Sequence, residues 1–422
     1  MKKFNLFLIG LAAIGAVGCS SDEPKGGAEN GEDTPRVEIE LSRGQQEVVN
    51  AQNGFALRLF NQLLSTGAPT KNHIVSPLSL SLALSMTANG AAGTTLDEIY
   101  TTLGYEGATS EEVNSLARVM MDRLPAADGK TRLAIANSMW INSGLPVLDS
   151  FKQDGMKWYD AEIANLKLNT DDARHTINKW ISNKTEKMIP EFLKENLTCK
   201  LALINTLYFK STWSRAFDAG MTKPMIFNNI SGGKPLVKMM DSGSETVFRG
   251  CEDDGAVIVT LPYGNGTFSM TLILPPAEQS LSDFASTLTE TKLKEWMIYM
   301  NTVAEDKKPE LLQVMMPKFK IEASYDMIEV MKSLGMKSAF YSSADFSRIS
   351  PASLMIETLK QKNIIEVDEA GTKIASVTDV EFGFTSPGPL LSNLVVFDRP
   401  FIYMITEEST GAILFMGTVA EM

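Results

Sequence analysis

The chain has 422 residues, of which 44% are apolar and 21% are charged. It carries 39 Lys and Arg against 51 Asp and Glu, which gives a formal net charge of -12. The composition is that of a globular protein. It excludes a general binder of nucleic acid or anionic membranes, because such proteins need a basic surface to displace counterions from phosphates. Basic or neutral proteins remain as partners.

The chain is poor in the side chains that most catalytic and metal sites use. Its two histidines, His73 and His175, are too few for a His-rich metal site. Most Ser/His or Cys/His catalytic triads also need an imidazole, which this chain mostly lacks. We expect both to be structural or solvated, and we expect no metal, no cofactor and no enzymatic activity. The spacing of Cys199 and Cys251 matches no metal or redox motif, which favours buried or unpaired thiols over a disulfide.

The first 18 residues resemble a bacterial lipoprotein signal peptide. Two lysines precede an apolar stretch, residues 4–17, that is too short to span a bilayer comfortably. Residues 16–19 read Ala-Val-Gly-Cys and resemble a lipobox, in which Cys19 becomes the lipidated first residue of the mature chain. The alternative is an ordinary secretory signal with an incidental cysteine.

The segment after the lipobox is rich in Gly and in charged residues and cannot bury much apolar area, so residues 19–44 are predicted to form a lipidated, flexible tether. The acidic residues directly after Cys19 resemble the surface-export signal of some outer-membrane lipoproteins. We therefore expect an exported lipoprotein that contacts the outer membrane through its lipid anchor only. Its periplasmic or surface orientation stays open.

Hydrophobic periodicity predicts a mixture of helices and strands beyond residue 45. Amphipathic helices are predicted over Val48–Ser65 and Ala173–Met188, and a more apolar helix over Leu78–Asn89. Strands are predicted over Leu201–Phe209, Ala256–Leu261, Phe268–Leu274, Leu312–Met316, Leu394–Phe397, Phe401–Thr406 and Ala412–Val419. Several of these strands are too continuously apolar to have a solvated face. Because helices and strands do not alternate strictly, we expect an α+β chain with one large core.

Short motifs occur in one order from about residue 45 to the C-terminus. They are Asn72–Ser79, Asn89–Ile99, Ile177–Trp180 with Lys184-Thr185, Asn205–Lys210 with Trp213, Pro317–Glu322, Ala344–Ser347, Asp398–Phe401 and Leu414–Gly417. In this order they resemble the serpin family of protease inhibitors. The resemblance implies a single large domain over residues 45–422, with mixed and antiparallel sheets surrounded by eight or nine helices. It also implies a monomer with an exposed reactive-centre loop at about residues 369–396.

The resemblance assigns two internal sites to the main sheet. In the family, a buried network called the shutter combines two Ser, an Asn and usually a His; Ser76, Ser79 and Asn205 match it, and Gln361 stands at the His position. Glutamine offers donors and an acceptor, so we expect altered opening energetics rather than loss of the fold. Trp213 lies in the strand behind the breach, which is the upper opening of the sheet.

Residues 372–382 have the pattern of a strand with one buried side. The even positions are uncharged, all three charges fall on odd positions, and no proline occurs before Pro387. Taken alone, this pattern also fits a native half-buried strand. The resemblance implies instead a loop that becomes a new strand after cleavage. Its hinge would comprise Glu369, Gly371, Thr372, Ile374, Ala375 and Ser376.

The function implied by the resemblance is suicide inhibition of proteases. A protease cleaves the loop, forms its acyl-enzyme and is distorted when the loop inserts. Counting from the hinge places the reactive bond between Thr385 and Ser386, with the bond between Phe384 and Thr385 as the alternative. Residues 380–390 contain no Lys or Arg. The expected targets are therefore chymotrypsin-like, elastase-like, subtilisin-like or papain-like enzymes.

One residue of the hinge favours a different reading. Inhibitory members mostly carry a small residue where this chain has Ile374, and a bulky inward side chain would slow insertion, so that the loop is cleaved as a plain substrate. Thr372, by contrast, favours inhibition, because it is uncharged. A charged residue at this position would have to be desolvated during insertion. The alternative function is that of a non-inhibitory member which acts as a binding or carrier protein.

Overall fold

Nine α-helices occur in the part of the chain that the computed structural model describes, which is residues 35–66, 71–244, 248–306, 312–372 and 394–422. They are α1 (Arg43–Thr66), α2 (Pro77–Ala88), α3 (Gly93–Leu103), α4 (Ser110–Arg123), α5 (Asp149–Tyr159), α6 (Asp171–Lys184), α7 (Leu281–Ser286), α8 (Glu290–Asp306) and α9 (Ile328–Ser333). The described residues belong to one compact unit. Within the described ranges, no helix is both long and apolar enough to cross a bilayer.

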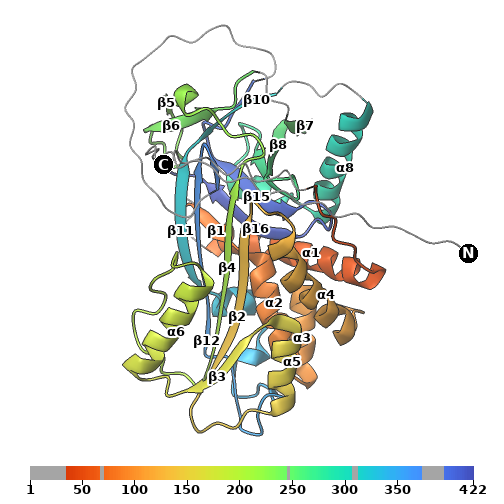
Figure 1. Cartoon of the computed structure of the whole chain (residues 1–422), viewed down its shortest axis with the longest axis vertical. Coiled ribbons are helices and arrows are strands. Elements are labelled where there is room, and N and C mark those ends of the chain that lie inside the picture. The colour runs from red at the N-terminus through yellow and green to blue at the C-terminus, as the bar shows by residue number, and fades with distance from the viewer. Residues whose placement is uncertain (1–34, 67–70, 245–247, 307–311, 373–393) are drawn as a thin grey trace, which may run out of the picture. The chain divides into compact units, whose positions relative to one another are not determined.

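The main sheet has six strands in the order β11-β12-β13-β4-β2-β3. They are β11 (Phe319–Asp326), β12 (Thr358–Asp368), β13 (Gly371–Thr372), β4 (Leu201–Thr212), β2 (Arg132–Asn142) and β3 (Glu162–Leu166). The long strands run vertically in Figure 1. The first nine of the twelve residues of β4 are all buried, as expected for a central strand covered on both faces.

Two further sheets complete the fold. The first is six-stranded and has the order β1 (His73–Val75), β16 (Ile413–Val419), β15 (Phe401–Glu407), β9 (Phe268–Leu274), β8 (Ala256–Tyr263) and β7 (Arg249–Asp253). The second is four-stranded and has the order β14 (Leu394–Val396), β10 (Gln313–Pro317), β6 (Leu236–Asp241) and β5 (Lys223–Ile226). The described chain re-enters at β14, directly after residues 373–393.

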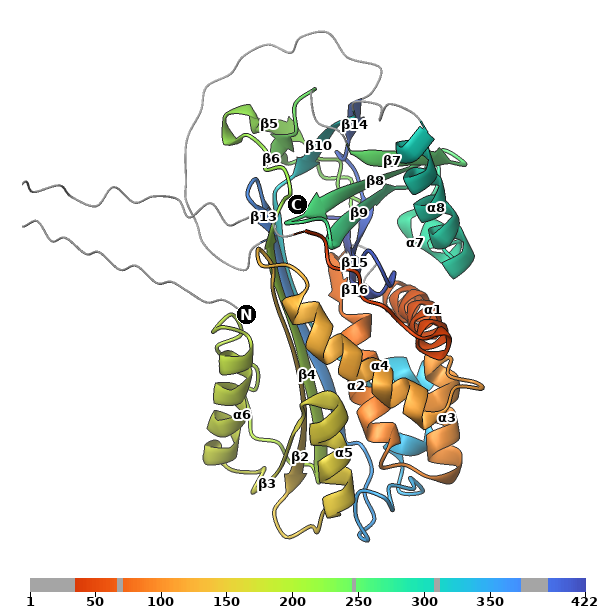
Figure 2. The same cartoon turned by 45° about the vertical axis from the view of Figure 1, so that its right-hand side comes forward.

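Helices cover both faces of the main sheet. In Figure 2 α6 lies on one face, whereas α2, α4 and α5 lie on the other. Every residue of α2 is buried, and the helix begins with Pro77 after Ser76, whose side chain accepts a hydrogen bond from the Ser79 N–H. This N-cap places two seryl side chains at the sheet's inner face.

Most of the predicted elements are confirmed with small shifts at their ends. The helix α1 begins at Arg43, five residues before the predicted start at Val48. The helix predicted over Ala173–Met188 differs at its other end, because α6 ends at Lys184. Glu186 and Lys187 have φ values of 48° and 65°, in the left-handed region that a continuing helix does not use. Met188 fits the helical period but lies beyond the helix.

Candidate functional site

The chain turns back on itself at the upper end of β12. Val367 pairs with Thr372 and Asp368 with Gly371, so β12 and β13 form a hairpin with a two-residue connection. The Asp368 carboxylate accepts hydrogen bonds from the backbone N–H groups of Ala370, at 2.9 Å, and Gly371, at 3.2 Å. The turn therefore fixes the register of the chain that leaves it.

This hairpin places the predicted hinge inside the main sheet. Gly371 pairs with Thr212 and Thr372 with Ser211, so β13 lies between β12 and β4 and runs antiparallel to both. A Cβ on Gly371 would lie 2.1 Å from the carbonyl oxygen of Ser211, and its φ is 151°. Glycine is therefore required by the close approach of β4 as well as by the backbone conformation.

Below β13 the two neighbouring strands separate. β12 pairs with β4 only from Thr358–Gln361 to Ala202–Asn205, in parallel orientation. Residues 362–366 of β12 and 206–210 of β4 face each other without a pairing among the described residues. We call this stretch the slot. Its two edges offer backbone groups of the kind that recruit another strand.

Thr372 is held in the upper end of the slot by Tyr263. The Thr372 side chain is buried, and its hydroxyl hydrogen-bonds the Tyr263 hydroxyl. The Tyr263 ring stacks on Trp213, with centroids 4.4 Å apart, and burial raises the pKa of Tyr263 far above its ordinary value. The phenol thus stays protonated. The sequence reasoning missed Tyr263 because the predicted strand ended two residues before it.

Trp213 and Glu369 hold the connection of the hairpin. The Trp213 indole N–H donates to the carbonyl of Asp368 at 2.9 Å, and its backbone N–H donates to the carbonyl of Ala370 at 3.0 Å. The Glu369 carboxylate accepts from Lys318 at 2.5 Å and from the Thr222 hydroxyl at 2.7 Å. Burial raises the pKa of Glu369, but these partners outweigh it, so that its pKa is lowered.

The four predicted shutter residues meet below the slot. Gln361 accepts a hydrogen bond from the Ser76 backbone N–H at 3.1 Å and donates to the Ser76 carbonyl at 2.8 Å. Ser79 donates to the side-chain oxygen of Asn205, which in turn donates to Asn137 at 2.7 Å. All are buried. The network therefore bridges the start of α2 and the strands β12, β4 and β2.

Asn363 also belongs to this network, although sequence reasoning did not identify it. It lies at the level of the slot with 1% of its surface exposed, and its amide donates to Gln361 at 2.9 Å. Its Oδ1 atom is buried and has no hydrogen-bond partner among the residues that the structure describes. A buried acceptor in this state is costly, and a hydroxyl entering the slot would satisfy it.

Several predicted site residues lie outside the described residues. They are Cys19, Ile374, Ala375, Ser376, Phe384, Thr385 and Ser386. The described part of the hinge, Glu369, Gly371 and Thr372, is brought together with Trp213.

The comparisons decide the family. A sequence model of the family described as serpin (serine protease inhibitor) matches residues 50–422. The chain belongs to the serpin family. A serine protease inhibitor of Cyanea capillata is 31% identical over 89% of this chain and 98% of its own length. The leukocyte elastase inhibitor of Bos taurus is 31% identical over 89% and 99%, respectively.

The similarity to solved serpins extends over the whole fold. Native tengpin, a thermophilic serpin, matches with a TM-score of 0.78 and 30% identity, over 92% of this chain and 97% of its own. The predicted α+β serpin fold is thereby confirmed as a single domain with three sheets and, in the described ranges, nine α-helices. The serpin family is a family of protease inhibitors, and its members are generally not enzymes.

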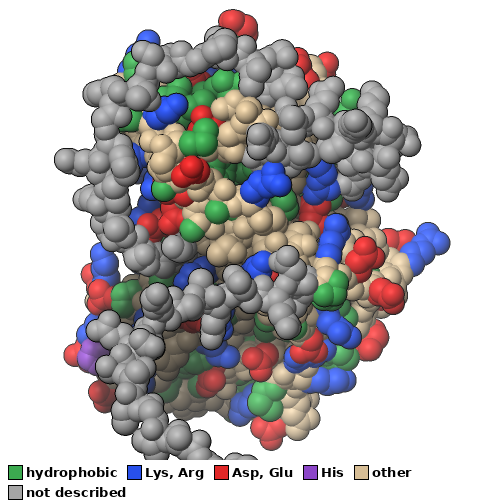
Figure 3. All heavy atoms as spheres, turned by 45° about the horizontal axis from the view of Figure 1, so that its top comes forward, with side chains coloured by type: hydrophobic (Ala, Val, Ile, Leu, Met, Phe, Trp, Pro, Cys, Tyr) green, Lys and Arg blue, Asp and Glu red, His purple; other side chains and the backbone are tan. Residues whose placement is uncertain are grey.

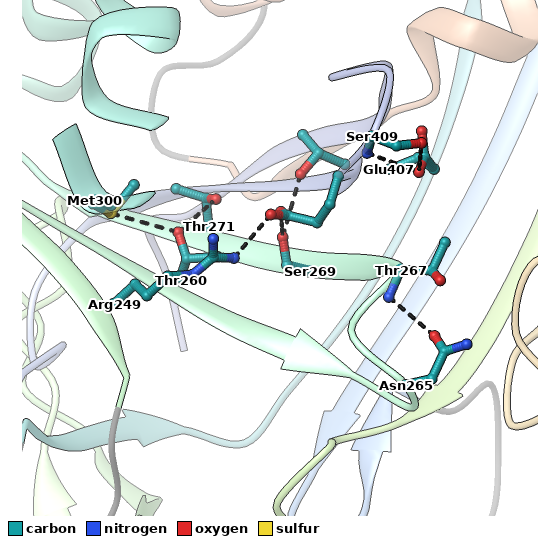
Figure 4. A network of polar contacts seen from close by, with 11 residues as sticks. Arg249, Thr260, Asn265, Thr267, Ser269, Thr271, Met300, Glu407 and Ser409 are labelled. Carbon is teal, nitrogen blue, oxygen red and sulfur yellow. Dashed lines mark hydrogen bonds and ion pairs between the residues drawn. The ribbon is translucent and has the colours of Figure 1, made fainter. Parts of the chain in front are cut away.

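This serpin also contains a cavity remote from the hinge. It is a partly open pocket of about 350 Å³ among α1, α8 and the strands β7, β8, β9 and β15. Its apolar lining includes Ile258 and Met300, and its polar lining includes Arg249, which binds the Glu408 carboxylate at 2.8 Å. Figure 4 shows Arg249 beside Thr260 and Met300, with Ser269 contributing a further bond to the same carboxylate.

The histidines and cysteines lie apart from the hinge. His73 is buried on β1, with Nδ1 3.2 Å from the Tyr325 hydroxyl, whereas His175 is exposed on α6. Cys199 and Cys251 are free thiols, the first buried and the second half-buried. Burial, with a contribution from nearby Asp253, raises the pKa of Cys251 to about 11, so this thiol stays protonated at neutral pH.

Proposed function

We propose that this serpin is an irreversible suicide-substrate inhibitor of serine endopeptidases, with papain-like cysteine endopeptidases as a second target class. The seated hinge carries this proposal: Gly371 and Thr372 already occupy the first two positions of an additional strand between β12 and β4. Unpaired strand edges continue below them in the slot. Cleavage of the loop would release the chain to fill those edges.

The register of β13 specifies where each inserted residue would lie. Continuing the two observed pairings past Thr372 places residue 374 beside Ile365 of β12 and Phe209 of β4. Both neighbours are buried and apolar. The bulky Ile374 would thus enter an apolar environment, where burying its side chain stabilises by about 1.5–3 kcal/mol. Its size is compatible with insertion in this register.

The same register places hydroxyl groups beside polar side chains. Residue 376 falls beside Asn363, and residue 378 falls beside Gln361. Ser376 would offer a donor to the unpartnered Oδ1 atom of Asn363, and Thr378 would enter the shutter. The inward face of the loop therefore matches the slot residue by residue.

The outward face of the loop is complementary in charge. Continuing the pairing with β12 places Lys373 beside Glu366 and Asp379 beside Lys360. Each is an opposite-charge cross-strand pair, which stabilises a sheet by about 0.2–1 kcal/mol. A slip of one residue would turn these charges toward the core, so the hairpin at residues 367–372 protects the correct register.

The chemistry of inhibition belongs to the protease and its geometry to the serpin. The protease nucleophile bonds to the carbonyl carbon of Thr385, the amide bond to Ser386 breaks, and the new amine leaves with a proton. Residues 372–385 inserted as a strand span about 43 Å at 3.3 Å per residue. The acylated protease would be carried from the upper end of the main sheet to its lower end, which requires the β12–β4 pairing at the shutter to open.

Target selection would rest on the loop sequence. Figure 3 shows basic and acidic side chains interspersed on the face that carries the upper end of the molecule. A mixed surface of this kind offers little electrostatic steering toward one class of protein. The absence of Lys and Arg from residues 380–390 favours chymotrypsin-like, elastase-like, subtilisin-like and papain-like targets.

The test is to mix the purified mature protein with a panel of these four protease classes. We expect at least one of them to form a covalent complex that survives boiling in detergent. Mass spectrometry of the released C-terminal peptide would locate the cut after Thr385, or after Phe384 in the alternative. Clean cleavage by every active protease, without a complex, would contradict the proposal.

A second candidate function is that of a non-inhibitory carrier. The observation that favours it is the cavity of about 350 Å³ with an apolar lining and an Arg249–Glu408 ion pair, which is the usual composition of small-molecule sites. Native mass spectrometry of the purified protein tests it. A bound small molecule together with clean loop cleavage would favour the carrier, whereas a covalent protease complex would favour the inhibitor.

The cellular location forms part of the proposal. Residues 1–18 act as a lipoprotein signal peptide, Cys19 carries the lipid, and residues 19–44 tether the serpin domain to the outer membrane. Intact-mass measurement of the mature protein tests the lipid, and Cys19→Ala should release the protein from the membrane fraction. Protease treatment of whole cells distinguishes a surface from a periplasmic orientation.

A further inference from the structure

Tyr263 connects the hinge to a different sheet. It ends β8, a strand of the sheet that contains β7, β9 and β15, yet it also forms an isolated bridge with Trp213 beyond the end of β4. Backbone hydrogen bonds lie on either side of it. The Ser214 N–H donates to the Pro262 carbonyl at 2.9 Å, and the Gly264 N–H donates to the Thr212 carbonyl at 2.8 Å. The backbone of Tyr263 is thereby fixed relative to the upper end of the main sheet.

The side chain of Tyr263 is fixed as well. Its ring is completely buried, lies parallel to the Trp213 ring within 9°, and meets the edge of Phe209 at a centroid distance of 5.3 Å. A ring packed on both sides in this way has one orientation available to it. That orientation directs its hydroxyl to Thr372.

We propose that Tyr263 is a positioning residue for loop insertion, because its hydroxyl holds Thr372 at the second position of the new strand, directly after Gly371. This inference rests on the proposed inhibitory function. Trapping is a competition between strand insertion and hydrolysis of the acyl-enzyme. A hinge that is already in register avoids both the search for that register and the one-residue slip that would bring charged residues inward.

The burial of Thr372 explains why the Tyr263 hydroxyl matters. A hydroxyl placed in an apolar surrounding without a partner is destabilised, and Thr372 is 1% exposed. Its strand neighbour Ser211 does not supply that partner with its side chain, since the Ser211 hydroxyl lies 2.7 Å from the Thr131 hydroxyl. Loss of the Tyr263 hydroxyl would therefore favour departure of Thr372 from the slot.

The test measures the stoichiometry of inhibition, which is the number of serpin molecules consumed per protease molecule trapped. We expect Tyr263→Phe to raise it by about 2- to 10-fold, the range that corresponds to one hydrogen bond. The association rate constant of the Tyr263→Phe serpin with a protease whose catalytic nucleophile has been removed should stay unchanged. Adding Thr372→Val to Tyr263→Phe should lower the stoichiometry again, because the double variant leaves no unpartnered hydroxyl in the slot.

A matched control separates positioning from general stability. Tyr105 is equally buried and its hydroxyl accepts a hydrogen bond from Gln52 at 2.8 Å, but it lies on the helical side of the molecule. Tyr105→Phe should lower the melting temperature without changing the stoichiometry. An unchanged stoichiometry for Tyr263→Phe in a protein that traps its protease would overturn the inference.

A second measurement decides the inference even if no protease is trapped. Hydrogen exchange of a peptide covering residues 367–372 reports directly whether the hinge is seated. Tyr263→Phe should accelerate exchange in this peptide by about 2- to 10-fold, while Tyr105→Phe leaves it unchanged. Equal exchange in Tyr263→Phe and the unmodified protein would overturn the positioning role, whereas a missing covalent complex would count against the proposed function alone.

Discussion

Gln361 binds both backbone polar groups of Ser76 through a single side chain. Its amide oxygen accepts from the Ser76 N–H and its amide nitrogen donates to the Ser76 carbonyl. The residue before α2 is thereby attached to β12 at the lower end of the slot. An amide, which offers a donor and an acceptor together, makes this paired contact without any change of protonation.

Gln361→Ala should destabilise the native protein by about 1–3 kcal/mol, because it leaves the buried Ser76 N–H unsatisfied. The Ser76 carbonyl would keep its hydrogen bond from the Leu80 N–H, at 3.2 Å. Denaturant unfolding followed by fluorescence measures this change. Gln153→Ala, at an exposed position of α5, serves as the control and should be neutral. Equal stability of the two variants would show that the shutter is not held by Gln361.

Gly371→Ala should expel β13 from the sheet. The new Cβ would lie 2.1 Å from the Ser211 carbonyl oxygen, and an unstrained backbone conformation is not available at that position. We expect faster proteolysis within residues 367–372 and a cost of about 1–3 kcal/mol in seating the hinge. Gly129→Ala, where nothing lies within 4 Å of the added atom, is the matched control. If both variants resist proteolysis equally, β13 is not seated as described.

The ion pair of Glu369 with Lys318 should make hinge stability depend on pH. The folded pKa of Glu369 is lowered from 4.5, because its partners outweigh the effect of burial. A carboxyl group with a lowered pKa stabilises the fold fully above its unfolded value, and this contribution is lost as the pH falls through the folded value. The melting temperatures of the unmodified protein and Glu369→Gln should therefore differ at neutral pH and converge as the pH falls through the lowered pKa of Glu369. A constant difference across this range would contradict the assignment.

Ser376→Ala should affect the cleaved form and leave the uncleaved form unchanged. In the inserted register Ser376 would lie beside Asn363, whose Oδ1 atom has no hydrogen-bond partner within the described part of the chain. We expect the melting temperature of the loop-cleaved protein to fall by an amount that corresponds to about 0.5–1.5 kcal/mol. Ala375→Ser, on the opposite face of the strand, is the control. An effect of Ser376→Ala on the uncleaved protein alone would argue against this register.

The sequence predicts where most helices and strands lie, but it does not predict that the hinge is already paired within the main sheet. Alternation in residues 372–382 predicted a strand with a buried side, and Thr372 does lie on a buried side. The position of that strand depends on pairing with Ser211, more than a hundred residues away in the chain, which no local pattern encodes. Helical periodicity likewise carried the prediction for α6 past Lys184 to Met188, because periodicity does not register left-handed residues.

The partners within the site were the least predictable part. Asn137, Tyr263 and Asn363 are ordinary strand residues in the sequence, and each acquires its role from a neighbour on another strand or sheet. The shutter and breach residues were identified in advance because a family resemblance supplied the long-range contacts. Physical pattern alone would have left Ser76, Gln361 and Trp213 unremarked.

The most direct test of the whole account is hydrogen exchange in the slot before and after the loop is nicked. The backbone amides of residues 206–210 that face β12 lack a described strand partner in the uncleaved protein. If the cleaved loop inserts, these amides and those of residues 362–366 become part of a continuous ladder, and their exchange should slow by orders of magnitude. Exchange that stays as fast after cleavage as before would show that the loop does not enter the sheet.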